Sequence, residues 1–168
     1  MSMASSEMIP TQEPGAATGG IAHAIDLRVR YSETDQMGSF YNGRAFEWFE
    51  CGRTELLRSI GLPYTEIEAR GVFLPVVEAL ARFVGRARYD DLLTVGTVVS
   101  FEGRARLRCD VTIHHKNTGK PVASGHTIHA FMDVNGRPMR PPGWFLEATR
   151  RAQAQAKAHS KANNGEQV

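Results

Sequence analysis

The chain has 168 residues, of which 42% are apolar and 23% are charged, and its formal net charge is +2 at pH 7. This composition fits one globular domain with a hydrophobic core, and a charge so near neutral argues against a dedicated nucleic-acid-binding protein. No apolar run approaches the roughly 18 to 20 residues that span a bilayer, so we expect no membrane segment.

The first 22 residues are rich in Ser, Ala, Gly, Pro and Thr, and they lack the basic start and apolar centre of a secretory signal. Because such a segment buries little apolar surface, we expect residues 1–22 to form a disordered tail. The two cysteines, Cys51 and Cys109, have no metal-ligand spacing, and we expect both to be reduced thiols in the core. Nothing in the sequence requires an oxidising compartment, so the expected location is the cytoplasm.

A strand, a polar loop and a helix follow one another between residues 24 and 60. Apolar and polar residues alternate from residue 24 to about residue 31, which predicts a half-buried strand. Residues 44–60 hold large apolar residues over too long a span for one strand, and they predict a buried helix that another element wraps. Gly61 and Pro63 then mark the end of that helix.

The rest of the chain predicts a short helical turn and linker over residues 64–71 and then an antiparallel sheet. Apolar alternation indicates strands over residues 76–84, 92–101, 105–113 and 122–133, and Asn135-Gly136 indicates a hairpin leading to a short strand over residues 137–140. A short helix is expected over residues 144–151, and residues 152–168 are expected either to extend it as a frayed helix or to be disordered. The predicted fold class is α+β, in a domain spanning residues 23–151.

Asp35 lies in the polar loop that leads into the predicted helix. The first N–H groups of a helix have no partner within the helix, and the helix dipole is positive there. A carboxylate beside such donors supplies a base or nucleophile together with hydrogen bonds for a developing oxyanion, which acyl transfer requires. The alternative is that Asp35 only forms a turn or caps the helix.

The string around Asp35, VRYSETDQMG followed by FYNG and WFECGRTELLR, resembles the motif of the hot-dog-fold acyl-CoA thioesterases, specifically the 4-hydroxybenzoyl-CoA thioesterase-like family. The later string RYDDLLTV resembles a second motif of that family, and the resemblance covers residues 24–148. It implies a hot-dog fold, in which an antiparallel sheet of about five strands wraps around one long central helix. It also implies a homodimer with one continuous sheet, or a dimer of such dimers.

The resemblance further implies that the protein hydrolyses an acyl-CoA thioester to a free acid and CoA, without a metal or a redox cofactor. Asp35 matches the family's essential carboxylate, which either activates water or attacks the thioester carbonyl. Asn42 matches the residue whose backbone N–H polarises that carbonyl, and its neighbour Tyr41 is a candidate substrate-binding residue. The family commonly has Asn at the position of Arg44 and an aromatic residue at the position of Ala45, which leaves the acyl specificity open.

Four further charged residues are candidates for the site. By resemblance, Arg104 matches part of a basic cluster that binds the CoA phosphates, and alternation puts Arg106 on the same strand face; a solvated outer face is the alternative. We expect Glu33 to be a solvated loop residue rather than an acid/base partner of Asp35. Glu78 lies in an apolar strand and needs a partner, so it either assists catalysis or pairs with an arginine.

Other chemistries have less support. The six histidines show no metal-binding spacing on a helix, and we expect them to be surface or packing residues. A G-x-S-x-G motif is absent, which disfavours an α/β-hydrolase. A hydratase or dehydratase on the same fold would pair the Asp with a nearby His, but no His lies between His23 and His114. A non-catalytic acyl-CoA-binding module is the second alternative.

Overall fold

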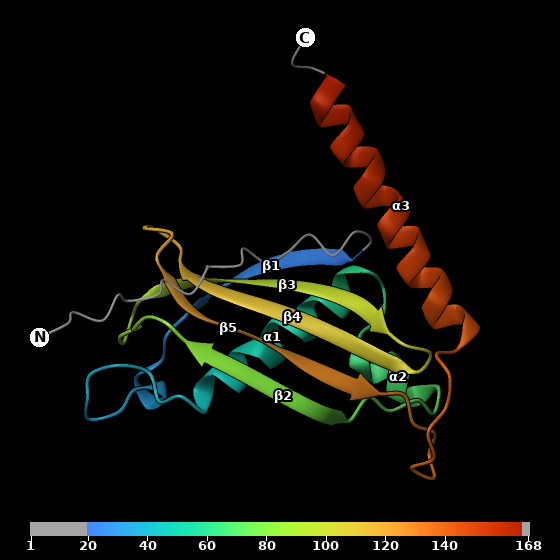
Figure 1. The fold of residues 1–168 in the computed structure, drawn as a ribbon, viewed down its shortest axis with the longest axis horizontal. Coiled ribbons are helices and arrows are strands. Elements are labelled where there is room, and N and C mark those ends of the chain that lie inside the picture. Colours follow the sequence, from blue (N-terminus) through green and yellow to red (C-terminus); the bar gives the residue numbers. More distant parts are fainter. Residues whose placement is uncertain (1–19, 166–168) are drawn as a thin grey trace, which may run out of the picture.

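The computed structural model describes residues 20–165 (Figure 1), so residues 1–19 of the predicted N-terminal tail lie outside the described part. A five-stranded antiparallel sheet has the strand order β1-β3-β4-β5-β2. Its strands are β1 (Ile21–Arg28), β2 (Val76–Phe83), β3 (Leu92–Glu102), β4 (Arg106–His115) and β5 (Pro121–Ala130). The helices are α1 (Arg44–Ser59), α2 (Tyr64–Ala69) and α3 (Gly143–Gly165), and a 3-10 turn covers Tyr31–Glu33.

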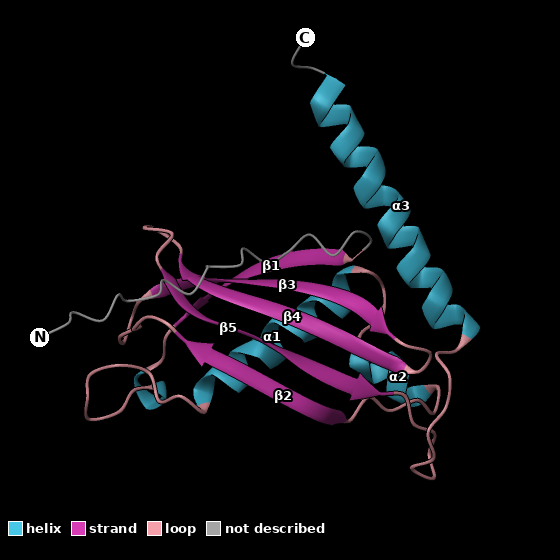
Figure 2. Ribbon diagram, viewed as in Figure 1, coloured by secondary structure: helices cyan, strands magenta, loops and turns pink. Residues whose placement is uncertain are grey.

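The sheet curls around α1, which crosses its concave face (Figures 1 and 2). The helix turns a broad apolar stripe to the strands, and Trp48, Phe49, Leu56 and Leu57 are all buried. Gly52 lets the helix approach the sheet, because a Cβ there would lie 2.3 Å from Thr97 Oγ1. The arrangement confirms the α+β class and the hot-dog fold that the sequence indicated.

The inner face of the sheet carries the apolar residues of each alternating strand. In β4, for example, Leu107, Cys109, Val111 and Ile113 are buried, while the residues between them are partly exposed. The strand β2 differs, since it forms one edge of the sheet and its side chains are almost all exposed. One edge of the sheet is therefore both apolar and accessible.

Some local expectations need correction. The segment over residues 137–140 is not a strand but a single bridge, Met132–Pro138, with bonds from the Asp133 N–H to the Arg137 carbonyl and from the Met139 N–H to the Phe131 carbonyl, both at 2.9 Å. Prolines at 141 and 142 follow it and lack the N–H donors that a ladder needs. The helix α3 continues past residue 151 into the segment that was expected either to extend it or to be disordered, and it projects away from the sheet (Figure 1). Cys51 is exposed rather than in the core, because it shares a stripe of α1 with Glu47 and Arg58.

Within the part of the chain that the structure describes, no helix has the length and apolar character needed to cross a bilayer.

Candidate active site

Asp35 begins a tight turn in the loop between β1 and α1. Its N–H donates to the Ser39 carbonyl oxygen at 2.9 Å, its carbonyl accepts the Gly38 N–H at 3.1 Å, and Thr34 pairs with Phe40 in the next rung. Gly38 has a φ of +68°, which a glycine adopts without strain. The residues 33–41 thus form a small hairpin, and we call them the Asp35 loop.

The Asp35 carboxylate is half-buried and only partly engaged. Its Oδ1 accepts the Met37 N–H at 2.8 Å, which fixes the side chain in an Asx turn. Within residues 20–165, no protein group donates a hydrogen bond to Oδ2. One carboxylate oxygen therefore stays available to a water molecule or to a bound carbonyl.

The second arm of the Asp35 loop is anchored to three elements. The Tyr41 N–H donates to the Glu33 carbonyl and the Phe40 N–H to the Ala87 carbonyl, both at 2.8 Å. The Phe40 ring packs against Trp48 of α1, with ring centroids 5.0 Å apart, and against Phe83 at the end of β2, at 6.0 Å. These contacts set the position of Asp35 relative to the start of α1.

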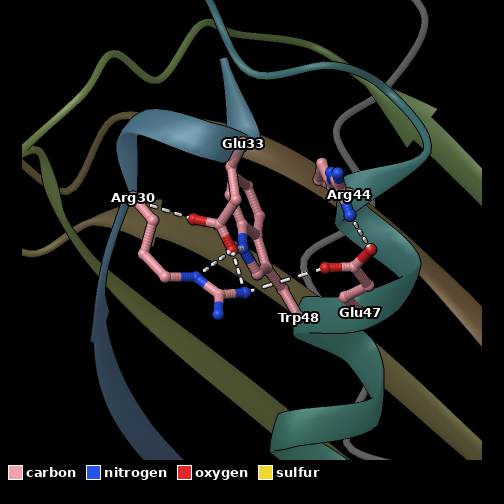
Figure 3. A network of polar contacts seen from close by, with 5 residues as sticks. All are labelled: Arg30, Glu33, Arg44, Glu47 and Trp48. Carbon is pink, nitrogen blue, oxygen red and sulfur yellow. Dashed lines mark hydrogen bonds and ion pairs between the residues drawn. The ribbon is translucent and has the colours of Figure 1, made fainter.

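Glu33 is buried beneath the loop, contrary to the expectation of a solvated residue; only 2% of it is exposed. The 3-10 turn directs its side chain inward, where Arg30 donates from its backbone N–H (2.6 Å), Nε (3.0 Å) and Nη2 (2.8 Å), and Trp48 Nε1 donates at 3.0 Å (Figure 3). Burial alone would raise the pKa of Glu33, but these hydrogen bonds outweigh it and hold the pKa below its usual value. Glu33 is therefore an ionised anchor of the loop.

The same network extends to the first turn of α1. Arg30 Nη2 lies 3.7 Å from Glu47 Oε2, and Glu47 also pairs with Arg44 (Figure 3). Arg44, which stands where the family commonly has Asn, is thus committed to an ion pair on the helix. Its charge compensates Glu47 beside the loop.

The start of α1 presents an unpaired donor next to the loop. Gly43 is the N-cap, and the Arg44 N–H donates to the Tyr41 carbonyl at 2.8 Å. Among the described residues, the Asn42 N–H has no acceptor. Both Asn42 and Tyr41 are exposed. Three predicted residues, Asp35, Tyr41 and Asn42, therefore lie in the segment that leads directly into the N-terminus of α1.

The predicted phosphate-binding residues lie at the other end of the sheet. Arg104 is exposed in the β3–β4 turn, and Arg106 opens β4, 3.9 Å from Glu102. The Asp35 loop lies beside the opposite end of β3, because Val29 bonds to Asp91 there. An 11-residue strand spans about 35 Å. Within one chain, these arginines are not close to Asp35.

Glu78 pairs with a histidine and not with an arginine. Glu78 Oε1 accepts from His126 Nε2 at 2.9 Å, on the outer face of the sheet. The interaction arises because the edge strand β2 leaves Glu78 exposed and the β2–β5 register puts His126 beside it. Of the two alternatives for Glu78, the described residues show a structural pairing, with His126 in place of an arginine.

A buried polar cluster went unnoticed in the sequence. Arg53 is 8% exposed, and its Nε donates to the Tyr64 hydroxyl at 3.0 Å. His129 is fully buried; its Nδ1–H donates to the Leu74 carbonyl and its Nε2 accepts from Thr127, both at 2.9 Å. Burial, and then the Arg53 charge, lower the pKa of His129 to about 4. The sequence did hold a signal for Arg53. It lies four residues after Phe49 and four before Leu57, so it shares a helix face with two buried apolar residues.

Two cavities lie away from the Asp35 loop. One, of about 480 Å³, lies between α2, the chain before β2 and residues 132–136. The other, of about 380 Å³, lies on the outer face over β1, β3 and β4. Across residues 20–165, no cluster of three or more His, Cys, Asp or Glu side chains is arranged to hold a metal ion.

The fold and the loop agree with comparisons to known proteins. Residues 29–149 match the Thioesterase-like superfamily, and the chain belongs to that family. It is 38% identical to the putative acyl-CoA thioesterase YneP of Bacillus subtilis, over 43% of this chain and 52% of YneP. It is 30% identical to the chloroplastic acyl-acyl carrier protein thioesterase ATL3 of Arabidopsis thaliana, over 71% of this chain and 63% of ATL3.

The chain thus spans about half the length of YneP and less than two thirds of ATL3 in these matches. Among solved structures, it resembles Slr0204, a 1,4-dihydroxy-2-naphthoyl-CoA thioesterase from Synechocystis, with a TM-score of 0.71 and 21% identity over 76% of this chain and 95% of Slr0204. That likeness shows the fold. The family resemblance read from the Asp35 string is therefore confirmed.

Proposed function

We propose that this protein hydrolyses an acyl-CoA thioester to the free acid and CoA, with Asp35 acting at the reacting carbonyl. The observation that carries the proposal is that, among the described residues, one Asp35 carboxylate oxygen has no protein donor and the N–H of Asn42, the residue directly after the Asp35 loop, has no protein acceptor. The names of relatives such as YneP support the same reaction class.

Two routes are consistent with this geometry. In the first, Asp35 takes a proton from water as the water oxygen attacks the carbonyl carbon; the oxyanion accepts the Asn42 N–H, and collapse expels the CoA thiolate, which takes up the proton. In the second, an Asp35 oxygen attacks the carbonyl and expels the thiolate, and water then hydrolyses the mixed anhydride. Neither route requires a metal or a redox cofactor.

The test is release of CoA, followed with a thiol-reactive dye, from short, long and aromatic acyl-CoAs. Asp35→Asn keeps the shape of the side chain but removes the base and nucleophile, and we expect it to lower kcat by about 100-fold or more. The matched control is Asp26→Asn, because Asp26 lies on β1 and pairs with Lys116. If Asp35→Asn keeps full activity, the assignment of Asp35 is wrong.

Two further measurements separate the alternatives. Solvent ¹⁸O that enters the Asp35 carboxylate in a single turnover supports the anhydride route with water attacking the Asp35 carbonyl. Label found in the product acid alone excludes attack at that carbonyl. A wild-type protein that binds acyl-CoAs but releases CoA from none of them is a binding module. The hydratase alternative predicts addition of water to an enoyl-CoA, although no histidine lies within residues 29–43.

We also propose that two chains pair antiparallel through β2 to form a homodimer. This edge strand exposes Val76 (51%), Val77 (49%) and Leu80 (39%), and an apolar, unpaired edge is a ready site for strand addition. A two-fold axis near the middle of β2 puts the Phe83 end of one strand beside the Val76 end of its partner.

The pairing would complete the site. Phe83 contacts Phe40 of the Asp35 loop, whereas the chain before Val76 bonds to β5 near the β3–β4 turn, through Ala130 N–H and the Pro75 carbonyl at 3.2 Å. The Asp35 loop of one chain would therefore face the end of its partner that carries Arg104 and Arg106, where the CoA phosphates would bind. A dimer of dimers is a further assembly of the same unit.

Light scattering coupled to size-exclusion chromatography tests the dimer. We expect Val77→Lys to put a charge into the shared edge and yield a monomer with low activity, whereas Val134→Lys, at another exposed apolar position (68%), leaves the mass unchanged. A wild-type monomer would refute the pairing.

The cytoplasm remains our proposed compartment, since both Cys51 and Cys109 are free thiols.

A further inference from the structure

The cavity beside α2 has an apolar body. Its volume of about 480 Å³ lies within the range of small-ligand pockets, roughly 300–1,000 Å³. The apolar lining comes from the chain before β2 and from the segment after β5, namely Phe73, Leu74, Pro75, Met132 and Val134. Tyr64, the first residue of α2, also lines this cavity.

The Tyr64 hydroxyl has a donor without an acceptor. Its oxygen accepts from Arg53 Nε at 3.0 Å, so its own proton must point elsewhere. Within residues 20–165, no protein acceptor receives that proton. Burial raises the pKa of Tyr64, which keeps the phenol protonated and hence a donor. The cavity that Tyr64 lines is where an acceptor would be found.

Arg53 orients and polarises the Tyr64 hydroxyl. Its guanidinium carbon lies 5.8 Å from the centre of the Tyr64 ring, and Arg53 is 8% exposed without an ion pair to any described carboxylate. A cation that donates to a hydroxyl oxygen polarises the O–H bond and strengthens it as a donor. A buried cation without a counter-charge also favours a nearby ligand oxygen that carries negative charge.

The acidic residues of the cavity do not fill this role. Asp133 Oδ1 already accepts the N–H groups of Asn135 (2.9 Å) and Arg137 (2.8 Å). Glu68 is exposed on α2, at the rim of the cavity. Neither is bonded to Tyr64, so the Tyr64 proton is available to an acceptor on a molecule bound in the cavity.

We propose that this cavity receives the acyl group of the substrate, and that Tyr64, positioned by Arg53, donates a hydrogen bond to an oxygen at the far end of that group. The preferred substrate is thus an acyl-CoA with an apolar body and a terminal oxygen, either a hydroxyl or a carboxylate. This inference rests on the proposed thioesterase function and on the β2 pairing, which puts the cavity beside the partner's Asp35 loop.

The test compares three acyl-CoAs of one chain length: octanoyl-CoA, 8-hydroxyoctanoyl-CoA and the CoA monothioester of octanedioic acid. For the wild type, we expect kcat/KM to be about tenfold or more higher for an oxygenated substrate than for octanoyl-CoA, in line with one hydrogen bond to a buried donor. Tyr64→Phe keeps the ring and should bring this ratio close to one. Tyr89→Phe removes an exposed phenol elsewhere and should leave the ratio unchanged.

The role of Arg53 is tested by the same ratio. Arg53→Met should lower it, because the hydroxyl is no longer oriented, and Arg53→Lys should restore part of it. A purely structural role of Arg53 would reduce the rates for all three substrates together. A preference for the octanedioic thioester over the hydroxyl compound would show that the Arg53 charge contributes, and the reverse order would show a neutral acceptor.

Binding measured by calorimetry on Asp35→Asn separates this inference from the thioesterase proposal. If the wild type hydrolyses neither these three compounds nor any acyl-CoA of the wider panel, the proposed function fails. A tighter binding of the oxygenated compounds that Tyr64→Phe abolishes would still support the cavity. If the wild type hydrolyses all three at equal kcat/KM, or if Tyr64→Phe keeps the wild-type ratio, the inference about Tyr64 is wrong.

Discussion

Glu33 Oε1 accepts the indole N–H of Trp48 at 3.0 Å, and this bond ties the loop that carries Asp35 to the buried face of α1. One residue, Thr34, separates Glu33 from Asp35, and the Glu33 carbonyl also accepts the Tyr41 N–H on the returning arm of the loop. The position of the Asp35 carboxylate, the proposed catalytic group, therefore depends on a second carboxylate, Glu33, which is a buried anchor of the loop.

The first prediction concerns this anchor. Glu33→Gln should lower the free energy of unfolding by about 1–3 kcal/mol, because Arg30 and Trp48 lose their charged acceptor. It should also lower thioesterase activity, because the loop is less firmly held. Urea unfolding and CoA release measure the two effects. The control is Glu55→Gln, which breaks the exposed pair with Arg58 and should cost less than about 1 kcal/mol.

The pH dependence of the Glu33 effect has a definite sign. The pKa of Glu33 is lower in the folded protein than its usual value, so its stabilisation is present above the unfolded pKa and disappears as the pH falls through the folded pKa. The difference in stability between wild type and Glu33→Gln should therefore shrink under acidic conditions. A difference that stays constant down to low pH would contradict the ion-pair account.

The second prediction concerns His129, whose pKa is lowered from 6.5 to about 4. Between these values the unfolded chain binds a proton that the folded chain does not, so the free energy of unfolding should fall as the pH drops, by about 3 kcal/mol in total. His129→Gln should reduce this slope, whereas His114→Gln, on the partly exposed face of β4, should not. Equal slopes for wild type and His129→Gln would exclude His129 as the cause.

The third prediction concerns the contact between α1 and β3. Alanine is a better helix former than glycine by about 1 kcal/mol, yet Gly52→Ala should destabilise the protein by about 1–3 kcal/mol. The added Cβ would lie 2.3 Å from Thr97 Oγ1 and 2.9 Å from Val95 Cγ1.

A double variant tests the cause. If the clash is responsible, Thr97→Ala should make Gly52→Ala less costly in thermal unfolding. Gly143→Ala, where a Cβ meets nothing within 4 Å, should be close to neutral. A stabilised Gly52→Ala protein would mean that the helix and sheet are less closely packed than described.

The fourth prediction concerns the CoA phosphates. Arg104→Ala should raise KM for an acyl-CoA by about three- to tenfold, because an exposed arginine contributes a modest but specific phosphate contact. It should leave KM for the matching acyl-pantetheine, which lacks these phosphates, unchanged. Arg151→Ala, which removes an exposed charge on α3, is the control. An equal rise in KM for both substrates would argue against phosphate binding.

Much of the fold follows from local pattern. Residues 44–60 predicted the central helix almost to its observed ends, Arg44–Ser59, because a long apolar run has few other arrangements. The alternation in β4 predicted its buried face correctly. The wrapping of the sheet around α1 came from the family resemblance. The strand order was not predicted, since periodicity alone does not say which strands pair.

The parts that the sequence left hidden depend on distant partners. Glu33 looked like a solvated loop residue, but three hydrogen bonds from Arg30 and one from Trp48, fifteen residues later, compensate its burial. The Arg53–Tyr64 contact joins two helices whose packing no local pattern reveals. The length of α3 was left open between a helical extension and disorder, although its many Ala, Gln and Lys residues favour helix without any tertiary contact.

The tip of the Asp35 loop has few ties to the rest of the chain. Met37 is 73% exposed, and a Cβ at Gly38 would meet nothing within 4 Å, while the bonds that hold both arms lie below the tip. A longer flap over the entrance would have to keep the bonds that the Met37 and Gly38 N–H groups make to Asp35, because these bonds orient the carboxylate. The length of this loop is therefore coupled to the position of the proposed catalytic group.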